Sequence, residues 1–141
     1  MSIQGIPEGG FQSVGEIVAT NLLQFHPDQE GLAVAVELLS NHISGAPVVS
    51  NNGQFLGFIS EFDVLEAVES GKDLSKVQAR DIMNATHISV EEGTSLTEAV
   101  KIMKKGHLLV LPVVKNGVVL KSITRHDLLR ARVGLGPGVE G

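Results

Sequence analysis

The sequence predicts a mixed α/β (α+β) fold made of two tandem repeats, each a small three-stranded sheet with flanking helices, packed with pseudo-twofold symmetry. The first observation is an internal repeat: residues 47–49 match residues 112–114 at a shift of 65, and residues 60–65 match residues 124–129 at a shift of 64. The second is a turn between two apolar segments in each repeat, and the third is helical spacing of apolar residues elsewhere. A repeat of this length is typical of a duplicated supersecondary unit.

The first repeat is expected to run strand, helix, strand, turn, strand, helix. Leu32, Val36 and Leu39 recur at the spacing of one helix face. Asn51-Asn52-Gly53 separates two apolar segments, as a hairpin turn does. The expected elements are strands at Leu22–His26, Pro47–Ser50 and Gln54–Ser60, with helices at Gln29–Asn41 and Glu61–Glu69.

The second repeat follows the same order. Ser95 and Glu98 form the pattern of a capping box at a helix N-terminus, and Gly106 is placed to end that helix. Asn116-Gly117 is a strong signal for a two-residue hairpin turn. The expected elements after this helix are strands at Leu111–Lys115 and Val118–Thr124 and a closing helix at Arg125–Arg132.

The repeat also predicts the domain organisation. One repeat of about 60 residues buries too little apolar surface to fold alone, so the two sheets are expected to pack face to face and share one core. We therefore expect one integrated module with five segments: an N-terminal tail (1–13), repeat 1 (14–70), a linker (71–76), repeat 2 (77–133) and a flexible C-terminal tail (134–141).

Composition excludes several classes of protein. The chain has 141 residues, 43% of them hydrophobic, and no cysteine. A largely disordered chain, a disulfide framework, a thiolate metal site and a cysteine nucleophile are therefore excluded. No apolar segment has the length and flanking charge of a signal peptide or the length of a membrane span, so we expect a cytoplasmic protein without membrane contact.

The net charge of −5 is distributed unevenly along the chain. Residues 1–70 contain nine acidic residues and no Lys or Arg, whereas residues 71–141 contain eleven basic and seven acidic residues. The two parts carry charges of −9 and +4, which sum to −5. The basic residues are scattered and not interleaved with aromatic side chains, so we expect a solvated or protein-facing surface and no nucleic acid partner.

Two polar pairs, Ser60 with Asp63 and Thr124 with Asp127, stand where a strand enters a helix. One interpretation is structural: the hydroxyl caps the helix and the Asp completes a near capping box. The other is functional: a helix N-terminus attracts phosphate, the hydroxyl adds a donor, and the carboxylate accepts both hydroxyls of a ribose. A nucleotide needs these three elements together, so both pairs are candidate nucleotide sites.

The repeated Pro-Val-Val, turn glycine and Ser/Thr-x-x-Asp elements resemble those of the cystathionine-β-synthase (CBS) domain pair, or Bateman module. The resemblance covers residues 14–132, as in a stand-alone CBS-domain protein. It implies tandem CBS repeats and a regulatory adenine nucleotide (AMP, ADP or ATP) in the grooves between them. It also implies that Asp63 and Asp127 bind ribose hydroxyls and that Ser60 and Thr124 lie near the phosphate.

The base would need an apolar slot with backbone donors and acceptors, and the segment before each Pro-Val-Val supplies a candidate. The candidate slot residues are Ile43, Ser44, Gly45 and Pro47 in repeat 1 and Leu108, Val110 and Pro112 in repeat 2. By the resemblance, the backbone near Leu23 and Ile88 edges these pockets. The alternative is that the prolines only begin strands and the apolar residues belong to the core.

The second site is expected to be the more basic one, because Lys121, Arg125 and His126 lie next to its Thr-x-x-Asp element. Glu61 and Glu66 make the first site acidic. Several phosphates would therefore favour the second site. Lys121 replaces the small residue represented by Gly57 in repeat 1, so its side chain must point outward to leave room.

The sequence contains no arrangement that supports catalysis or metal binding. The histidines lack the spacing of metal ligands, and there is no nucleophile elbow or Walker glycine loop. His42 and His107 follow helices at equivalent positions, where C-terminal capping is expected. We predict a non-enzymatic, nucleotide-sensing module that signals to an effector on another polypeptide. A ligand-independent dimerisation scaffold and a nucleotide-hydrolysing enzyme are the alternatives.

A homodimer formed through the helices is also expected. Head-to-tail packing places the −9 part of one chain beside the +4 part of the other, whereas like-with-like packing places equal charges together. The charges therefore favour the head-to-tail arrangement, although apolar contacts can outweigh screened surface charge. The expected contact residues are Val64, Leu65, Val68, Leu128 and Leu129.

Overall fold

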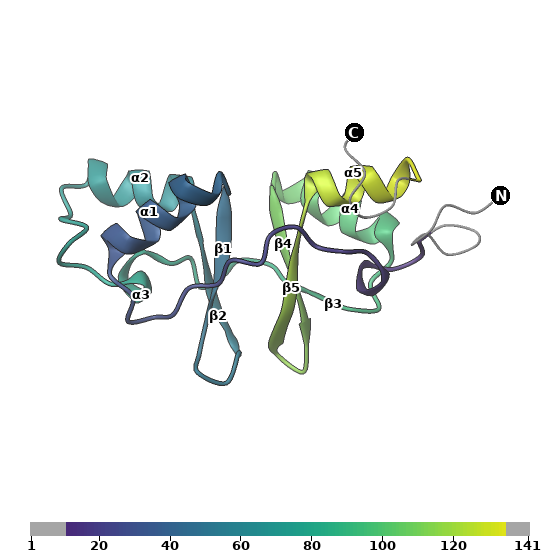
Figure 1. Cartoon of the computed structure of the whole chain (residues 1–141), viewed down its shortest axis with the longest axis horizontal. Helices are drawn as coiled ribbons and strands as arrows, with labels where there is room; N and C mark the ends of the chain where they lie inside the picture. The colour runs from purple at the N-terminus through teal and green to yellow at the C-terminus, as the bar shows by residue number, and fades with distance from the viewer. Residues whose placement is uncertain (1–10, 135–141) are drawn as a thin grey trace.

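The computed structural model describes residues 11–134, so most of both expected tails lies outside the described residues. Its elements confirm the predicted mixed α+β fold with two similar repeats (Figure 1). Repeat 1 comprises α1 (Gly31–Asn41), β1 (Gly45–Val49), β2 (Phe55–Ser60) and α2 (Glu61–Glu69). Repeat 2 comprises β3 (Val90–Glu91), α4 (Leu96–Gly106), β4 (Val110–Lys115), β5 (Val118–Thr124) and α5 (Arg125–Arg132). Two short helices precede the repeats, namely η1 (Val14–Glu16) and α3 (Ala79–Ile82).

Each repeat contains the predicted β-hairpin. β1 pairs antiparallel with β2, with Ala46 opposite Ile59, and β4 pairs antiparallel with β5, with Leu111 opposite Ile123. At the second turn both residues of Asn116-Gly117 have positive φ, 53° and 81°. This is the backbone shape that a two-residue hairpin turn requires and that Asn-Gly adopts readily.

The first strand of repeat 1 differs from the prediction. The expected strand at Leu22–His26 is reduced to a one-residue parallel bridge at Phe25, whose N–H donates to the Pro47 carbonyl at 2.9 Å and whose carbonyl accepts from the Val49 N–H at 2.8 Å. Pro27 follows closely and limits the strand, because proline has no N–H and restricts the residue before it. Repeat 1 therefore has a two-stranded sheet, whereas repeat 2 has three strands in the order β3-β4-β5.

The helix ends follow the local sequence closely. His42 and His107 end α1 and α4 in the left-handed conformation, with φ of 54° and 52°, which confirms their expected capping role. Ser95 caps α4, its Oγ accepting the Glu98 N–H at 3.1 Å. Within residues 11–134, no helix is both long enough and apolar enough to cross a membrane.

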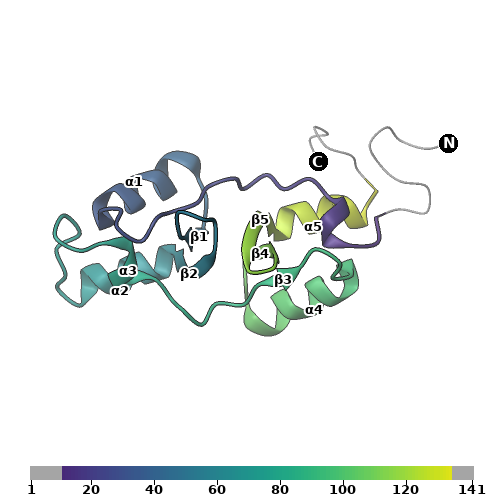
Figure 2. The same ribbon diagram turned by 90° about the horizontal axis from the view of Figure 1, so that it is seen from below.

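The first segment of each repeat packs on the other repeat. Residues 11–20 lie against repeat 2, and Ile17, which is 4% exposed, belongs to its core. Residues 79–84 lie against repeat 1, and Ile82 belongs to that core. We call these two segments the crossing segments. Figure 2 shows that they connect the repeats on opposite sides of the molecule, as a pseudo-twofold relation requires. Each repeat thus completes the core of its neighbour.

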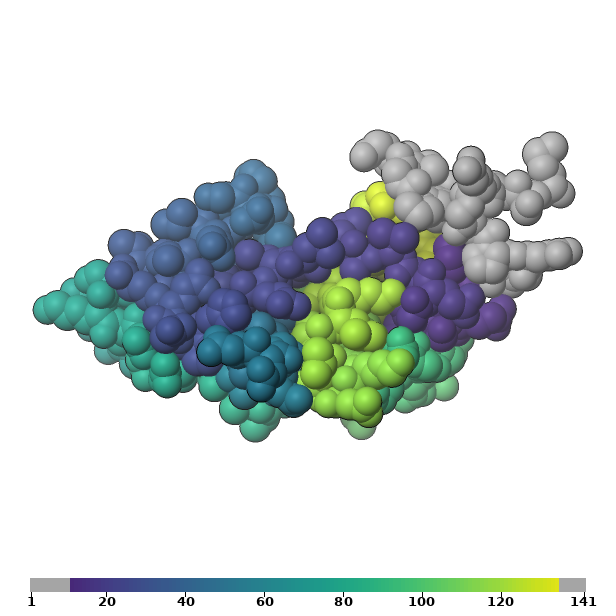
Figure 3. Space-filling view, turned by 60° about the horizontal axis from the view of Figure 1, so that its bottom comes forward, coloured from purple at the N-terminus to yellow at the C-terminus, as the bar shows by residue number. Residues whose placement is uncertain are grey.

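The expectation of one shared core is wrong, because each repeat has its own. The larger cluster of repeat 1 includes Phe25, Val34 and Ile59, and that of repeat 2 includes Leu96, Leu111 and Ile123. The helices of each repeat lie beside the hairpin of that repeat (Figure 1), and each main cluster contains residues from both. A small third cluster of Val49, Val114 and Val119 joins the two hairpins, whose tips meet in Figure 3.

Ile17→Ala is expected to lower the free energy of unfolding by about 2 to 5 kcal/mol, because the substitution leaves a cavity in the core of repeat 2. Urea unfolding measures this change. Val18→Ala is the matched control: Val18 is 58% exposed, and its loss should change stability by about 0.5 kcal/mol or less. Equal effects of the two substitutions would contradict the packing of this segment.

Candidate functional site

A groove with a volume of about 500 Å³ lies between the two repeats. From the N-terminal part it is lined by Thr20, Asn21, Asn41, His42, Ile43 and Ser44. From repeat 2 it is lined by Leu109, Val110, Thr124, Arg125 and His126. The groove therefore joins the predicted slot of repeat 1 to the Thr-x-x-Asp element of repeat 2, two parts that lie far apart in the sequence.

The phosphate-attracting end of this groove is the N-terminus of α5. Thr124 is the N-cap: its Oγ1 accepts the Asp127 N–H at 3.1 Å, and its own N–H donates to Asp127 Oδ2 at 2.9 Å. Thr124 and Asp127 therefore form the capping box that the structural interpretation of this pair predicts. Arg125 and His126 are exposed at the same helix end, where the helix dipole is also positive. This end of the groove suits an anion.

The Asp127 carboxylate lies directly behind the groove. It is 2% exposed, and it accepts hydrogen bonds from Thr20 Oγ1 at 2.8 Å and from the Thr20 N–H at 3.3 Å. Thr20 itself lines the groove. A ligand hydroxyl can therefore reach Asp127 only if the Thr20 hydroxyl shares the carboxylate or moves aside.

Lys121 does not bring its charge into the groove. Its Nζ donates to the carbonyls of Ile17 at 2.6 Å and Gly15 at 3.1 Å, and it is not among the lining residues. Burial lowers the pKa of Lys121, and the charges of Glu92 and Asp127 oppose this effect. The side chain thus holds the N-terminal crossing segment, a structural role that the sequence interpretation did not include.

On the other side of the pseudo-twofold axis, the equivalent region contains Asp63 and the ring of His87. Its carboxylate, Asp63, accepts from the Ser60 N–H at 2.8 Å and the Ser60 hydroxyl at 3.0 Å. The imidazole of His87 stacks on Phe58 with ring centroids 3.9 Å apart and an interplanar angle of 10°. Its Nε2 lies 3.3 Å from the Val110 carbonyl oxygen.

His87 gives a prediction for the pH dependence of stability. Burial lowers its pKa, while the hydrogen bond to Val110 and the charge of Asp63 act in the opposite direction. The folded state therefore prefers neutral His87 more than the unfolded state does, so its contribution is complete above a pH of about 6.5 and is lost as pH falls through the lowered folded pKa. When the pH is lowered, the free energy of unfolding should therefore decrease more in the parent protein than in the His87→Leu variant. A pH-independent difference between their urea unfolding curves would contradict this.

Several of the other predicted residues do not line the open groove. Gly45, Pro47 and Pro112 are buried in β1 and β4, Leu23 packs against the core of repeat 1, and Ile88 is 45% exposed. Leu108 lines a different cavity, between α4 and α5. Of the predicted slot, Ile43, Ser44 and Val110 line the groove. Within residues 11–134, no group of three or more His, Asp or Glu residues could hold a metal ion.

Sequence interpretation missed the contribution of Thr20 and Asn21. Asn21 is 3% exposed, and its Nδ2 donates to the Gly45 carbonyl at 2.9 Å across the groove floor. The available signal was a pair of polar residues inside the otherwise apolar stretch between Ile17 and Leu23. Leu109 was missed as well, because its apolar neighbours indicate a core strand.

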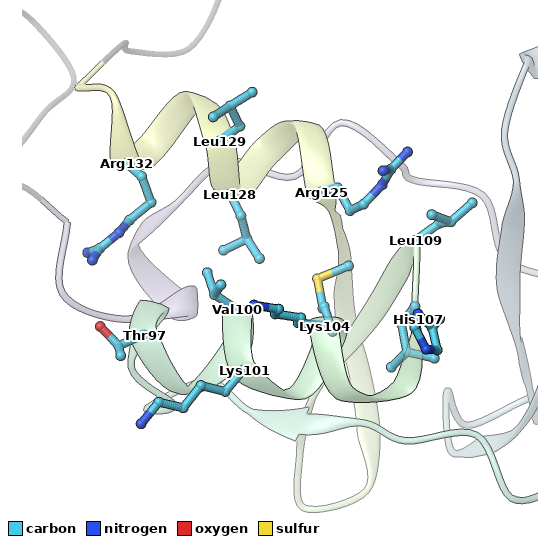
Figure 4. A pocket seen from close by; sticks show the side chains of 12 residues that line it. Thr97, Val100, Lys101, Lys104, His107, Leu109, Arg125, Leu128, Leu129 and Arg132 are labelled. Carbon is cyan, nitrogen blue, oxygen red and sulfur yellow. The ribbon is translucent and has the colours of Figure 1, made fainter.

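A larger cavity of about 1020 Å³ lies between α4 and α5. Figure 4 shows Val100 and Leu128 pointing toward one another between the two helices, while Leu129 projects from the outer side of α5 and Lys101 points away from the centre.

Two of the five residues expected to form dimer contacts are buried in the chain itself. Val64 is 8% exposed and Leu128 is 4% exposed, because each faces the hairpin of its own repeat. Leu65, Val68 and Leu129 remain accessible, with 52%, 47% and 63% of their surface exposed. This difference follows from helix geometry: consecutive residues of a helix point about 100° apart, so a buried residue can be followed directly by an accessible one.

A family model for the CBS domain matches residues 14–70 and 79–134. The chain belongs to the CBS domain family. Its two repeats are the two domains of a CBS pair, as the repeated motifs predicted. The match accounts for the paired hairpins and for the duplicated Ser/Thr-x-x-Asp elements.

Curated relatives of this CBS pair include longer proteins. An uncharacterised protein of Methanopyrus kandleri is 32% identical over 120 residues, which cover 84% of this chain and 61% of the relative. The chloroplastic CBS domain-containing protein CBSX1 of Arabidopsis thaliana is 29% identical, with 93% of this chain and 68% of the relative covered. The matches to two further relatives, both from Methanocaldococcus jannaschii, cover 25% and 40% of the length of those proteins.

Solved structures share the fold of this CBS pair. The structure of CBSX2 in complex with AMP has a TM-score of 0.76 and 23% identity, covering 87% of this chain and 97% of that chain. A putative acetoin utilization protein (AcuB) from Vibrio cholerae has a TM-score of 0.78 and 23% identity, covering 86% and 90%. At these identities the likeness shows the fold.

Proposed function

We propose that this CBS pair is a regulatory module, and not an enzyme, that binds an adenosine nucleotide (AMP, ADP or ATP) and signals to a partner protein. The observation that carries the proposal is the open groove, which joins an apolar slot at Ile43 and Ser44 to a basic helix N-terminus, with the Asp127 carboxylate behind it. The AMP complex of CBSX2, a protein of the same fold, supports the choice of ligand.

Each part of a nucleotide has a proposed partner in this groove. The base lies against Ile43 and the backbone around Ser44, and the ribose hydroxyls bind Asp127. The phosphates lie at the start of α5, where Thr124 supplies a hydroxyl and Arg125 supplies a fixed positive charge. A carboxylate at one end and positive charge at the other orient the ligand in one direction.

The contact between Thr20 and Asp127 suggests how binding is signalled. When ribose hydroxyls replace the Thr20 hydroxyl at Asp127, the crossing segment loses one of its attachments to repeat 2. Its other polar attachments include the bonds from Lys121 to Gly15 and Ile17. Nucleotide binding therefore loosens residues near Thr20, and a partner protein that contacts this segment detects the change.

The proposed assembly is a head-to-tail homodimer. The exposed faces of α1 and α2 are apolar and acidic, whereas the equivalent faces of α4 and α5 carry basic residues. Lys101 stands at the repeat position of Val36, and Arg125 stands at that of Glu61. Packing α1 and α2 of one chain on α4 and α5 of another buries both apolar faces and pairs opposite charges.

The proposed function is tested on purified protein. Mass spectrometry of small molecules released on denaturation should find an adenine nucleotide, and calorimetric titration should show saturable binding of AMP, ADP or ATP. A protein that forms dimers but binds none of the three would support the scaffold alternative and contradict the proposal. Steady formation of nucleoside products in the presence of Mg²⁺ would support the enzyme alternative.

A further inference from the structure

The two grooves have equivalent frames but different contents. The repeat relation pairs Asp127 with Asp63 and the Gly45 carbonyl with the Val110 carbonyl. In the open groove the Gly45 carbonyl accepts from Asn21 Nδ2 at 2.9 Å, a small amide at the groove floor. In the other groove the Val110 carbonyl lies 3.3 Å from a ring nitrogen of His87. The second groove therefore contains a flat aromatic ring where the first contains an amide.

Phe58 makes the platform for this ring. The equivalent position in repeat 2 is Ser122, which offers no aromatic surface. His87 lies nearly parallel to Phe58 at 3.9 Å, the geometry in which a nucleobase stacks on an aromatic side chain.

We propose that His87 blocks the second groove by occupying the place of a nucleobase, so that each chain binds one nucleotide. The inference rests on the proposed function, because it assumes that the open groove binds the nucleotide. The blocked groove retains the ribose-binding carboxylate: Asp63 is half-buried, and Ala85 stands at the repeat position of Thr20, so no equivalent hydroxyl covers it. Removal of the imidazole should therefore create a second site.

The second site should differ from the first in its response to phosphate. Glu61 stands at its helix N-terminus in the position that Arg125 has in the open groove. A negative side chain there repels phosphate, whereas the uncharged adenosine is not repelled. The unblocked groove should therefore bind adenosine more tightly than AMP, the reverse of the order expected for the first groove.

The test is calorimetric titration of parent, His87→Ala and His87→Asn with adenosine and with AMP. His87→Asn is the second variant because it keeps an N–H donor for the Val110 carbonyl and removes the ring. We expect one site per chain in the parent and two in both variants, the added site being lost again when Asp63→Ala is combined with His87→Ala. His26→Ala removes an exposed histidine and should leave one site.

The outcomes separate this inference from the proposed function. One site in the parent and one in both folded variants overturns the block by His87 but leaves the proposed function intact. Two sites in the parent also overturn it. Binding by the variants but not by the parent supports the block and contradicts nucleotide binding in the open groove. No binding by any of the proteins overturns both.

Discussion

Asp127→Ala should weaken AMP binding roughly ten- to a hundredfold, whereas Asp63→Ala should leave AMP binding unchanged. The loss corresponds to about 1.5 to 3 kcal/mol for hydrogen bonds to an ionised acceptor. The two substitutions are matched, because each removes the carboxylate at helix position N3 of a capping box. Asp127 has this position in α5, and Asp63 has it in α2. Asp127 contacts Thr20 of the open groove, whereas Asp63 belongs to the groove that we propose His87 blocks, so the effects on binding should differ.

Calorimetric titration measures these affinities, and thermal unfolding verifies that each variant is folded at the titration temperature. Arg125→Gln provides a second variant at an exposed position, where stability should change little. It should weaken binding of ATP more than binding of adenosine, because it removes positive charge at the phosphate end. Equal affinity of Asp127→Ala and Asp63→Ala for AMP would remove the ribose assignment.

Replacement of Lys101 and Lys104 by Glu should weaken the homodimer by about 2 kcal/mol, roughly thirtyfold in its dissociation constant. In a head-to-tail dimer each chain places this face of α4 against the acidic α1 and α2 of its partner. The dimer therefore contains two such contacts, and the substitutions weaken both. Sedimentation equilibrium of parent and variant measures the change. High salt should weaken the parent dimer and strengthen the variant dimer, because it screens attraction in one and repulsion in the other.

A like-with-like dimer predicts a different result. There the face of α4 and α5 would meet its own copy, and reversal of both charges would replace one repulsion by another. An unchanged dissociation constant would therefore contradict the head-to-tail arrangement. Lys115→Glu is a suitable control, because Lys115 lies at the end of β4 and its Nζ pairs with Glu92 at 3.4 Å, outside the α4 and α5 face.

Local sequence was sufficient for most of the fold. Asn116-Gly117 predicts its hairpin because the turn geometry depends on two adjacent residues. The helices expected at Glu61–Glu69 and Arg125–Arg132 are present with those bounds as α2 and α5. The duplicated Thr-x-x-Asp and Ser-x-x-Asp elements indicate equivalent helix starts, since capping involves residues three positions apart. These features are encoded by neighbours in the chain.

The difference between the two grooves was decided by tertiary structure. Asp63 and Asp127 have the same local pattern, but Thr20, which is 107 residues away from Asp127, covers one carboxylate. The ring of His87 fills the other groove through contacts with Phe58 and with the Val110 carbonyl, which lie in different repeats. Such contacts depend on how the two crossing segments pack, and packing between distant segments leaves no periodic signal in a single sequence.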